Sequence, residues 1–136
     1  MDENKKKICQ TAYQMFTRYG IKSVTMDELA RELSMSKRTL YEIFGDKNTL
    51  VKSTLELFIE KEKEDLQYIV ENSNDAINEM ALLSLHLNKI FMSLNPAVMF
   101  DMKKFHKDAH EMHESFKHEC LYNCISNNIE RGKKEG

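Results

Sequence analysis

Apolar residues recur along this chain at intervals of three and four, the spacing of one face of an α-helix. The first set is Ile8, Ala12, Phe16 and Tyr19, and it ends at Gly20, a residue typical of a helix C-terminus. This spacing predicts helices over 3–19, 25–33, 36–44, 46–71, 75–94, 96–105 and 107–130, followed by a polar tail over 131–136. No segment shows the alternation of a strand, so we expect an all-α fold.

Residues 26–44 fit a helix-turn-helix. Its two short crossed helices would bury five apolar side chains, those of Leu29, Leu33, Met35, Leu40 and Ile43. Ala30 falls where the helices approach most closely and only a small residue fits. Ser34 falls at the turn, where a positive φ favours glycine. A plain amphipathic helix pair would share the apolar spacing, but the small residue at Ala30 favours the helix-turn-helix.

Charge is distributed unevenly along the sequence. The net charge is −2, which by itself argues against a nucleic-acid-binding protein. Residues 1–50, however, carry nine Lys and Arg against seven Asp and Glu, whereas the remainder is acidic. A mildly basic N-terminal third suits a DNA-binding segment on a body that does not touch DNA.

The N-terminal motifs resemble those of the tetracycline-repressor (TetR) family over about residues 5–60. The resemblance is carried by Thr25-Met26-Asp27-Glu28-Leu29-Ala30, by Met35-Ser36-Lys37-Arg38-Thr39-Leu40-Tyr41, and by Phe44, Lys47 and Leu50. It implies an all-α homodimer with a three-helix DNA-binding domain, over residues 1–46, followed by a helical effector-binding and dimerisation domain, over residues 47–136. Family members usually continue with two further long helices that form the dimer interface, so we expect the regulatory domain to be incomplete here.

Seven side chains are predicted to contact double-stranded operator DNA. Lys37 and Arg38 can donate to guanine, and Thr39 offers a hydroxyl and a methyl group at the start of the recognition helix. The other four are predicted to contact phosphates: Thr25, Ser36, Tyr41 and Lys47. Lys47 opposes the dipole of its own helix, which a nearby phosphate would explain. In the family, residues matching Tyr41 and Lys47 commonly contact phosphate.

The predicted function is therefore a sequence-specific transcriptional regulator, a repressor that a small-molecule effector releases from its operator. An apolar, methionine-rich stretch could line the effector pocket or form plain core, and its candidate lining residues are Met80, Leu83, Leu87, Phe91, Met99, Phe100 and Met102. The alternative is a helix-turn-helix protein that is controlled by a protein partner or by no ligand.

Other site chemistry is weakly represented. His106, His110 and His113 share a helix face, with Glu114 and His118 nearby, but a solvated surface explains this spacing better than a metal site. No catalytic motif is present, so we expect no enzyme activity, no cofactor and no metal. Three cysteines without a C-x-x-C pair, and no signal peptide or apolar span, favour a cytoplasmic protein.

Overall fold

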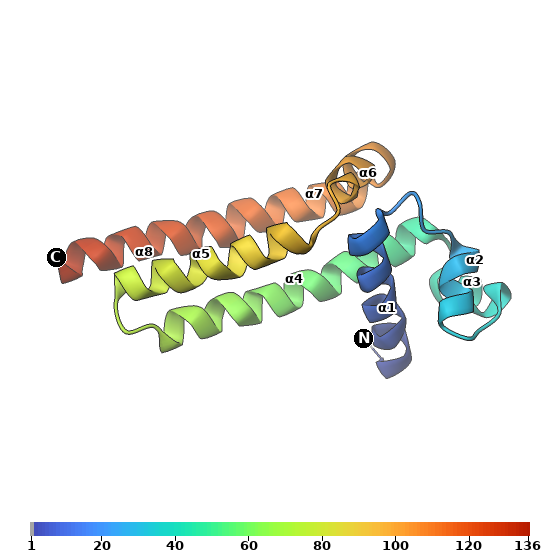
Figure 1. Ribbon diagram of the computed structural model, residues 1–136, viewed down its shortest axis with the longest axis horizontal. Coiled ribbons are helices and arrows are strands. Elements are labelled where there is room, and N and C mark those ends of the chain that lie inside the picture. Colours follow the sequence, from blue (N-terminus) through green and yellow to red (C-terminus); the bar gives the residue numbers. More distant parts are fainter. Residues whose placement is uncertain (1) are drawn as a thin grey trace. The chain divides into compact units, whose positions relative to one another are not determined.

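The computed structural model describes residues 2–136, and every regular element in that part of the chain is a helix (Figure 1). The all-α prediction is confirmed. Contacts divide the chain into two compact units. The first contains the chain up to Phe58 together with Leu94–Glu111, and the second contains Ile59–Ser93 and Met112–Gly136. The boundary expected after residue 46 lies inside the first unit.

The first unit is built from α1 (Glu3–Tyr19), α2 (Met26–Glu32), α3 (Lys37–Phe44), α6 (Ala97–Phe105) and the first half of α4 (Lys47–Asn72). Its core contains one fully buried side chain from each of the four N-terminal helices: Ile8, Leu29, Leu40 and Leu50. Tyr13 of α1 also stacks on Phe58 of α4, with 5.5 Å between ring centroids. These contacts fix the positions of α2 and α3.

Helix α6 is attached to the end of α1 by specific contacts. The Asn95 N–H donates to the Thr17 carbonyl at 2.8 Å, and the Lys22 N–H donates to Asp101 Oδ2 at 2.9 Å. Gly20 has a φ of 89°, and a Cβ there would lie 3.1 Å from the Cβ of Ala97. Only glycine therefore permits both this backbone and this close approach.

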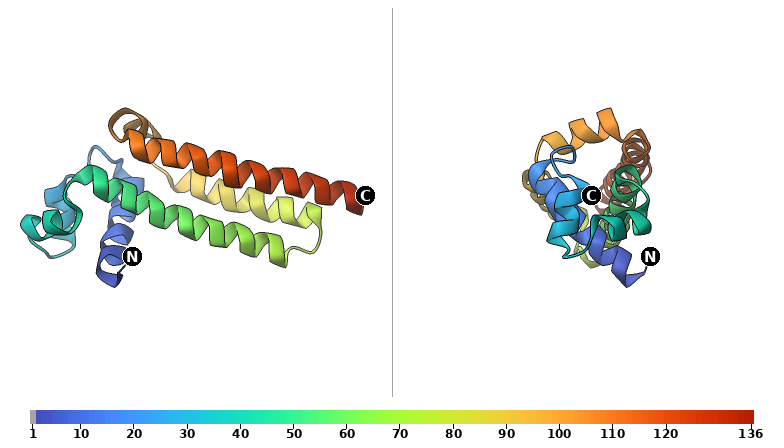
Figure 2. Two further views of the ribbon diagram at one scale, coloured as in Figure 1. Left: turned by 180° about the vertical axis from the view of Figure 1, so that it is seen from behind. Right: turned by 90° about the vertical axis from the view of Figure 1, so that its right-hand side faces the viewer.

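The second unit contains the end of α4, α5 (Ala76–Ser93), the end of α7 (Lys107–Phe116), a π-helical segment (Lys117–Leu121) and α8 (Tyr122–Glu135). Leu66, Leu83 and Phe116 form its buried core. Helices α5 and α8 run side by side (Figure 2). No helix within residues 2–136 has the length and apolar character needed to cross a bilayer.

The C-terminal end of the chain corrects the prediction of a polar tail, because α8 continues to Glu135. Arg131 reaches Glu79 Oε1 at 3.0 Å, and Glu135 Oε1 accepts the Ala76 N–H at 2.7 Å. That backbone hydrogen bond, followed by the contact with Arg131, lowers the pKa of Glu135. The polar side chains therefore serve as contacts with the start of α5, which hydrophobic periodicity does not reveal.

The remaining predicted helix bounds agree with the structure to within about two residues, the usual uncertainty of a helix end. One irregularity was not predicted. The helix expected over 107–130 contains the π-helical turn at Lys117–Leu121, and its flanking residues keep ordinary helical φ and ψ values. The apolar spacing around this turn gives no local sign of the extra residue.

Candidate nucleic-acid interface

Helix α2 begins at an N-terminus that the side chain of Thr25 caps. Thr25 Oγ1 accepts the Glu28 N–H at 3.1 Å and lies 3.1 Å from Glu28 Oε1, to which it donates. The first turn of α2 carries Asp27 and Glu28, whose charges complement the helix dipole. Thr25 itself is exposed beside this helix end. The side chain is therefore placed where a phosphate could approach it.

The turn between α2 and α3 has the geometry expected of a helix-turn-helix. Ser34 adopts a φ of 54°, which is positive as the sequence predicted. The Met35 N–H donates to the Ala30 carbonyl at 2.9 Å, and Ala30 is buried. The small side chain of Ala30 thus permits the turn to close against α2.

Helix α3 buries one face and exposes the other. Leu40 and Phe44 are buried in the first unit, whereas Lys37, Arg38 and Thr39 are exposed. Ser36 caps the helix by accepting the Thr39 N–H at 3.0 Å, and the two hydroxyl oxygens lie 2.8 Å apart. The N-terminal turn of α3 therefore presents two cations and a pair of hydroxyls to solvent.

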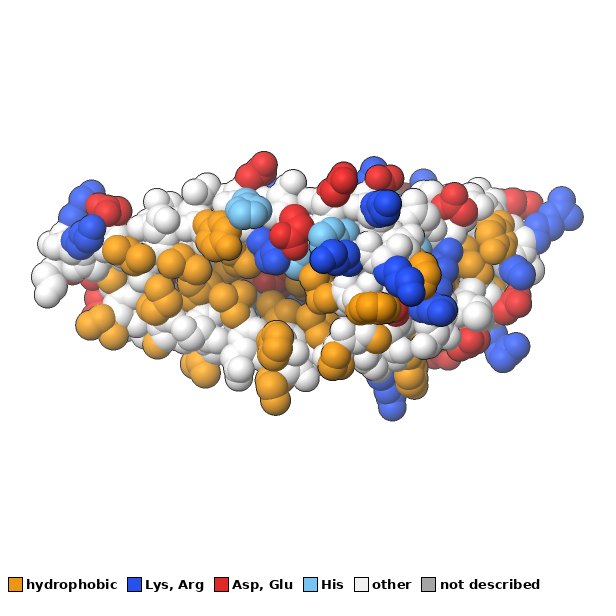
Figure 3. All heavy atoms as spheres, turned by 90° about the horizontal axis from the view of Figure 1, so that it is seen from above, with side chains coloured by type: hydrophobic (Ala, Val, Ile, Leu, Met, Phe, Trp, Pro, Cys, Tyr) orange, Lys and Arg blue, Asp and Glu red, His pale blue; other side chains and the backbone are white. Residues whose placement is uncertain are grey.

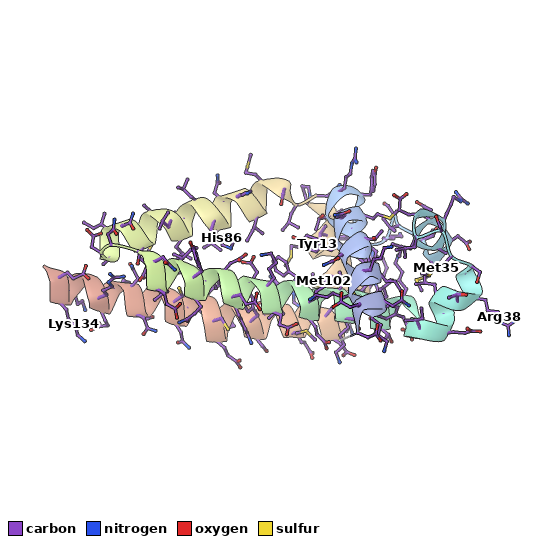
Figure 4. The ribbon with its side chains drawn as sticks, turned by 90° about the horizontal axis from the view of Figure 1, so that it is seen from below. Tyr13, Met35, Arg38, His86, Met102 and Lys134 are labelled. Carbon is purple, nitrogen blue, oxygen red and sulfur yellow. The ribbon has the colours of Figure 1, made fainter. Side chains whose placement is uncertain are left out.

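In the described part of the chain, the cations of α3 make weak surface contacts alone. Lys37 Nζ lies 3.3 Å from Asp27 Oδ1 and 5.9 Å from the centre of the Tyr41 ring. Arg38 Nε donates to Glu42 Oε1 at 3.1 Å, yet the Arg38 side chain is 89% exposed. Figure 4 shows Arg38 extending away from the helix. Exposed pairs of this kind contribute less than about 1 kcal/mol, so both cations are available to a ligand.

Lys47 has internal partners that the sequence did not reveal. Its Nζ donates to the Ile21 carbonyl at 2.7 Å and lies 6.0 Å from the centre of the Phe16 ring. Burial lowers the pKa of Lys47, and the negative charges of Asp101 and Glu28 oppose that shift. The ammonium therefore stabilises the segment between α1 and α2. This contact accounts for a cation at the start of α4 without a phosphate.

The family model described as "Bacterial regulatory proteins, tetR family" matches residues 8–54, which span α1 to the first turns of α4. The DNA-binding segment over residues 8–54 is of the TetR type. The matched residues include the whole of the helix-turn-helix and all seven of the predicted DNA-contacting side chains.

Two curated relatives of this chain are described as transcriptional regulators. The uncharacterized HTH-type transcriptional regulator YvaF of Bacillus subtilis (strain 168) is 31% identical over 105 residues, which cover 76% of this chain and 55% of YvaF. An HTH-type transcriptional regulator of Staphylococcus aureus (strain USA300) is 33% identical over 61 residues, covering 42% of this chain and 33% of the relative. The chain thus spans about half the length of the first relative and a third of the second.

Two solved structures share the TetR-type fold. A TetR-family transcriptional regulator from Bordetella parapertussis 12822 superposes with a TM-score of 0.69 at 18% identity, covering 99% of this chain and 71% of that one. The ketosteroid transcriptional regulator KstR2 of Mycobacterium tuberculosis gives a TM-score of 0.51 at 16% identity, covering 99% and 63%. At these identities the similarity shows the fold alone.

The residues predicted to line an effector pocket fall in different environments of the structure. Leu83 belongs to the core of the second unit, and Met80 and Leu87 pack against that core. Phe91 is 76% exposed on α5. The other three lie in the first unit, where Met102 is buried, Met99 is half-buried and Phe100 is exposed.

Hollows lie on either side of α8 among the described residues of the second unit, and most of the predicted lining residues lie elsewhere. A cavity of about 620 Å³ between α4 and α8 is lined by Leu66, Val70, Cys120 and Cys124, and by charged groups that include Lys63 and Arg131. An apolar hollow of about 440 Å³ between α5 and α8 includes Ile77, Met80 and Ile129. Figure 3 shows apolar side chains gathered over this helix pair. Lining from the π-helical segment and from α8 could have been anticipated from the apolar spacing of Cys120 and Cys124.

Proposed function

We propose that this chain binds double-stranded operator DNA in a sequence-specific manner and thereby represses transcription in the bacterial cytoplasm. The observation that carries the proposal is the α2–turn–α3 geometry, in which the capped start of α3 exposes Lys37, Arg38 and Thr39 beside Tyr41. A helix of this kind enters the major groove with its N-terminal residues against base edges. The match of residues 8–54 to the TetR family model supports the same role.

Base readout is assigned to the first turn of α3. Arg38 can form two parallel hydrogen bonds with guanine O6 and N7, and the Lys37 ammonium can donate to the same acceptors. Thr39 can place its methyl group against the methyl group of thymine. Because the pairs with Asp27 and Glu42 are exposed, replacing them with base contacts costs little.

Phosphate contacts are assigned to the edge of this interface. Thr25 and Ser36 lie at helix N-termini, where free N–H groups and the dipole favour an anion. Tyr41 can donate its hydroxyl to a phosphate. To contact a phosphate, the Lys47 ammonium would have to donate to the phosphate as well as to the Ile21 carbonyl, or give up its hydrogen bond with that carbonyl. We therefore assign it a double role, as a support for the α1–α2 connection and as a cation near the DNA backbone.

Regulation is assigned to residues 47–136, with a small-molecule effector as the controlling ligand. The cavity between α4 and α8 supports this proposal because its volume of about 620 Å³ falls in the range of small-molecule sites, roughly 300–1,000 Å³. Its mixed lining favours an effector with an apolar body and polar ends. The complete protein would act as a homodimer, since helix-turn-helix proteins of this kind read two half-sites.

The DNA-binding proposal is tested by selecting sequences from a random duplex library with the 136-residue chain. A recurring motif, confirmed by fluorescence anisotropy against a scrambled duplex, is the expected result. Enrichment of no motif, together with equal affinity for both duplexes, would exclude sequence-specific binding. Adding candidate effectors to the same assay separates a ligand-controlled regulator from one that answers to a protein partner.

A further inference from the structure

Three metal-ligating side chains lie together between α4 and α5 of the second unit. Glu62 and Asp65 are three residues apart on α4, and both lie near His86 of α5. Figure 4 labels His86. One ligand atom from each lies within 4.8 Å of the other two. Ligand atoms in tetrahedral sites, at about 2.0–2.2 Å from the ion, stand roughly 3.4 Å apart, so side-chain rotation that draws the three groups together would bring them into coordination.

Burial distinguishes this cluster from ordinary surface acids. The Glu62 side chain is only 7% exposed, and its Oε2 lies 2.9 Å from His86 Nε2, whose side chain is 20% exposed. A buried carboxylate is costly unless an opposite charge or several hydrogen bonds compensate it. A divalent cation would compensate Glu62 and Asp65 together. Asp65 is 32% exposed and leaves an opening for an ion and for water.

We propose that Glu62, Asp65 and His86 bind one divalent transition-metal ion of the Mn²⁺ to Zn²⁺ series. One imidazole nitrogen and two carboxylate oxygens suit these borderline ions, whereas Ca²⁺ and Mg²⁺ prefer ligand sets made of oxygen alone. Three protein ligands leave a coordination position open to water or to a small ligand. The proposal does not depend on DNA binding, because it concerns side chains of the second unit alone.

One neighbouring cation competes with the metal. Lys61 Nζ lies 3.2 Å and 3.5 Å from the two oxygens of Asp65. The Lys61 side chain is 72% exposed, so this pair is weak and can be displaced. Removing the competing charge should tighten metal binding. Lys61→Ala should therefore raise the metal affinity, whereas the loss of a ligand should lower it.

The experiment is calorimetric titration of the chelator-treated, 136-residue chain with Zn²⁺ and Mn²⁺, with Mg²⁺ and Ca²⁺ as comparison ions. We expect one saturable site per chain, with Zn²⁺ bound more tightly than Mn²⁺ and both more tightly than Mg²⁺ or Ca²⁺. His86→Ala and Asp65→Asn should each weaken Zn²⁺ binding by more than about tenfold. Lys61→Ala should strengthen it.

The matched control is His118→Ala, which removes an exposed histidine of the π-helical segment and should leave the affinity unchanged. Circular dichroism verifies that each variant is folded. If His86→Ala disturbs the helices, Asp65→Asn provides the test of metal binding. Asp65 is the most accessible of the three ligands, so its substitution should disturb the fold least. Absence of saturable binding, or full affinity in Asp65→Asn, would show that Glu62 and His86 form only a hydrogen bond that fastens α4 to α5.

Discussion

Arg38 is the residue at which the proposed reading of DNA is most directly measurable. Its side chain is 89% exposed, and within residues 2–136 its guanidinium pairs with Glu42 alone, so its loss should leave the fold of α3 intact. We expect Arg38→Ala to weaken binding to the preferred site by about 1–3 kcal/mol and to relax the preference at one base position. Anisotropy titrations against a set of single-base variants measure both effects.

Lys89→Ala is the control for Arg38→Ala, because it removes an exposed cation from α5, outside the helix-turn-helix. It should change neither affinity nor base preference. If Arg38→Ala weakened binding equally on every duplex, Arg38 would contact the DNA backbone and not a base.

Ser34 is the residue at which the turn of the helix-turn-helix stores conformational strain. Its φ of 54° is left-handed, which disfavours every side chain with a Cβ. Ser34→Gly should therefore be more stable than Ser34→Ala by about 1 kcal/mol. Urea unfolding of the two variants measures this difference directly, and equal midpoints would show that the turn relaxes without cost.

The capping residues and the turn could be predicted from sequence because each depends on local chemistry. Thr25 and Ser36 accept hydrogen bonds from residues three positions later, and Ser34 takes its conformation from the turn itself. The environment of Lys47 could not be predicted, since its partner Ile21 lies 26 residues away. The contact between Glu62 and His86 could not be predicted for the same reason, since the two residues are 24 positions apart in the sequence.

At the scale of elements, the attachment of α8 to α5 depends on a buried polar residue. Asn128 Nδ2 donates to the Ala76 carbonyl at 2.9 Å and to Glu79 Oε2 at 2.7 Å, and Glu79 is almost fully buried. Asn128→Ala would leave the carboxylate of Glu79 with one hydrogen bond fewer. We expect a loss of about 1–3 kcal/mol in the free energy of unfolding.

The neighbouring residue supplies a matched control for this substitution. Asn127 has the same side chain but is exposed on α8. Asn127→Ala should change the free energy of unfolding by no more than about 0.5 kcal/mol. Equal effects of the two substitutions in chemical denaturation would mean that helix propensity, and not the buried hydrogen bonds, governs the result.

The junction of α6 and α7 should make stability depend on pH. His106 is buried, and its Nδ1 lies 2.9 Å from Asn48 Oδ1. Burial and then the charge of Lys47 lower the pKa of His106, while Asp101 opposes the shift. The folded state therefore takes up this proton less readily than the unfolded state, so stability should fall as the pH drops below about 6.5.

His106→Gln tests the assignment because it removes the titrating group. The loss of stability between about pH 7.5 and about pH 5.5 should be smaller in the variant than in the parent chain. Urea unfolding at the two pH values gives the comparison, and an unchanged difference would assign the pH dependence to other groups.

The limits of prediction at this scale are visible at the end of α8. Residues 131–135 are polar and carry no hydrophobic periodicity, so they read as a tail in the sequence. In the structure Arg131 and Glu135 contact Glu79 and Ala76 across more than fifty residues. Helix bounds that rest on apolar spacing were predictable, whereas a helix held by polar contacts with a distant element was not.

At the scale of the whole molecule, the distribution of charge determines how DNA binding should respond to salt. The excess of basic residues is confined to residues 1–50, and the remainder is acidic. The affinity for DNA should therefore fall as the salt concentration rises. A plot of the logarithm of the binding constant against the logarithm of the salt concentration should have a slope of about −0.9 for each phosphate that the protein neutralises. Lys47→Ala should weaken binding to all sequences and make the slope shallower by about 0.9, if Lys47 reaches a phosphate.

Anisotropy titrations over a range of KCl concentrations measure this slope, with Lys89→Ala again as the control. Because Lys47 also supports the Ile21 carbonyl, the melting temperature of Lys47→Ala must be recorded alongside. A slope identical to that of the parent chain, with a lower melting temperature, would restrict Lys47 to its structural role.

The π-helical turn at Lys117–Leu121 bears on how this chain has diverged from its relatives. A π-turn accommodates one more residue than the α-helical turn it replaces, while the helix continues on both sides. A relative that lacks one residue within this segment can therefore retain the same faces of α7 and α8 in an unbroken α-helix. An alignment that instead places such a gap in the Asn72–Asp75 connection would shift the pairing by one residue, about 100° around each helix, throughout α5, α6 and α7.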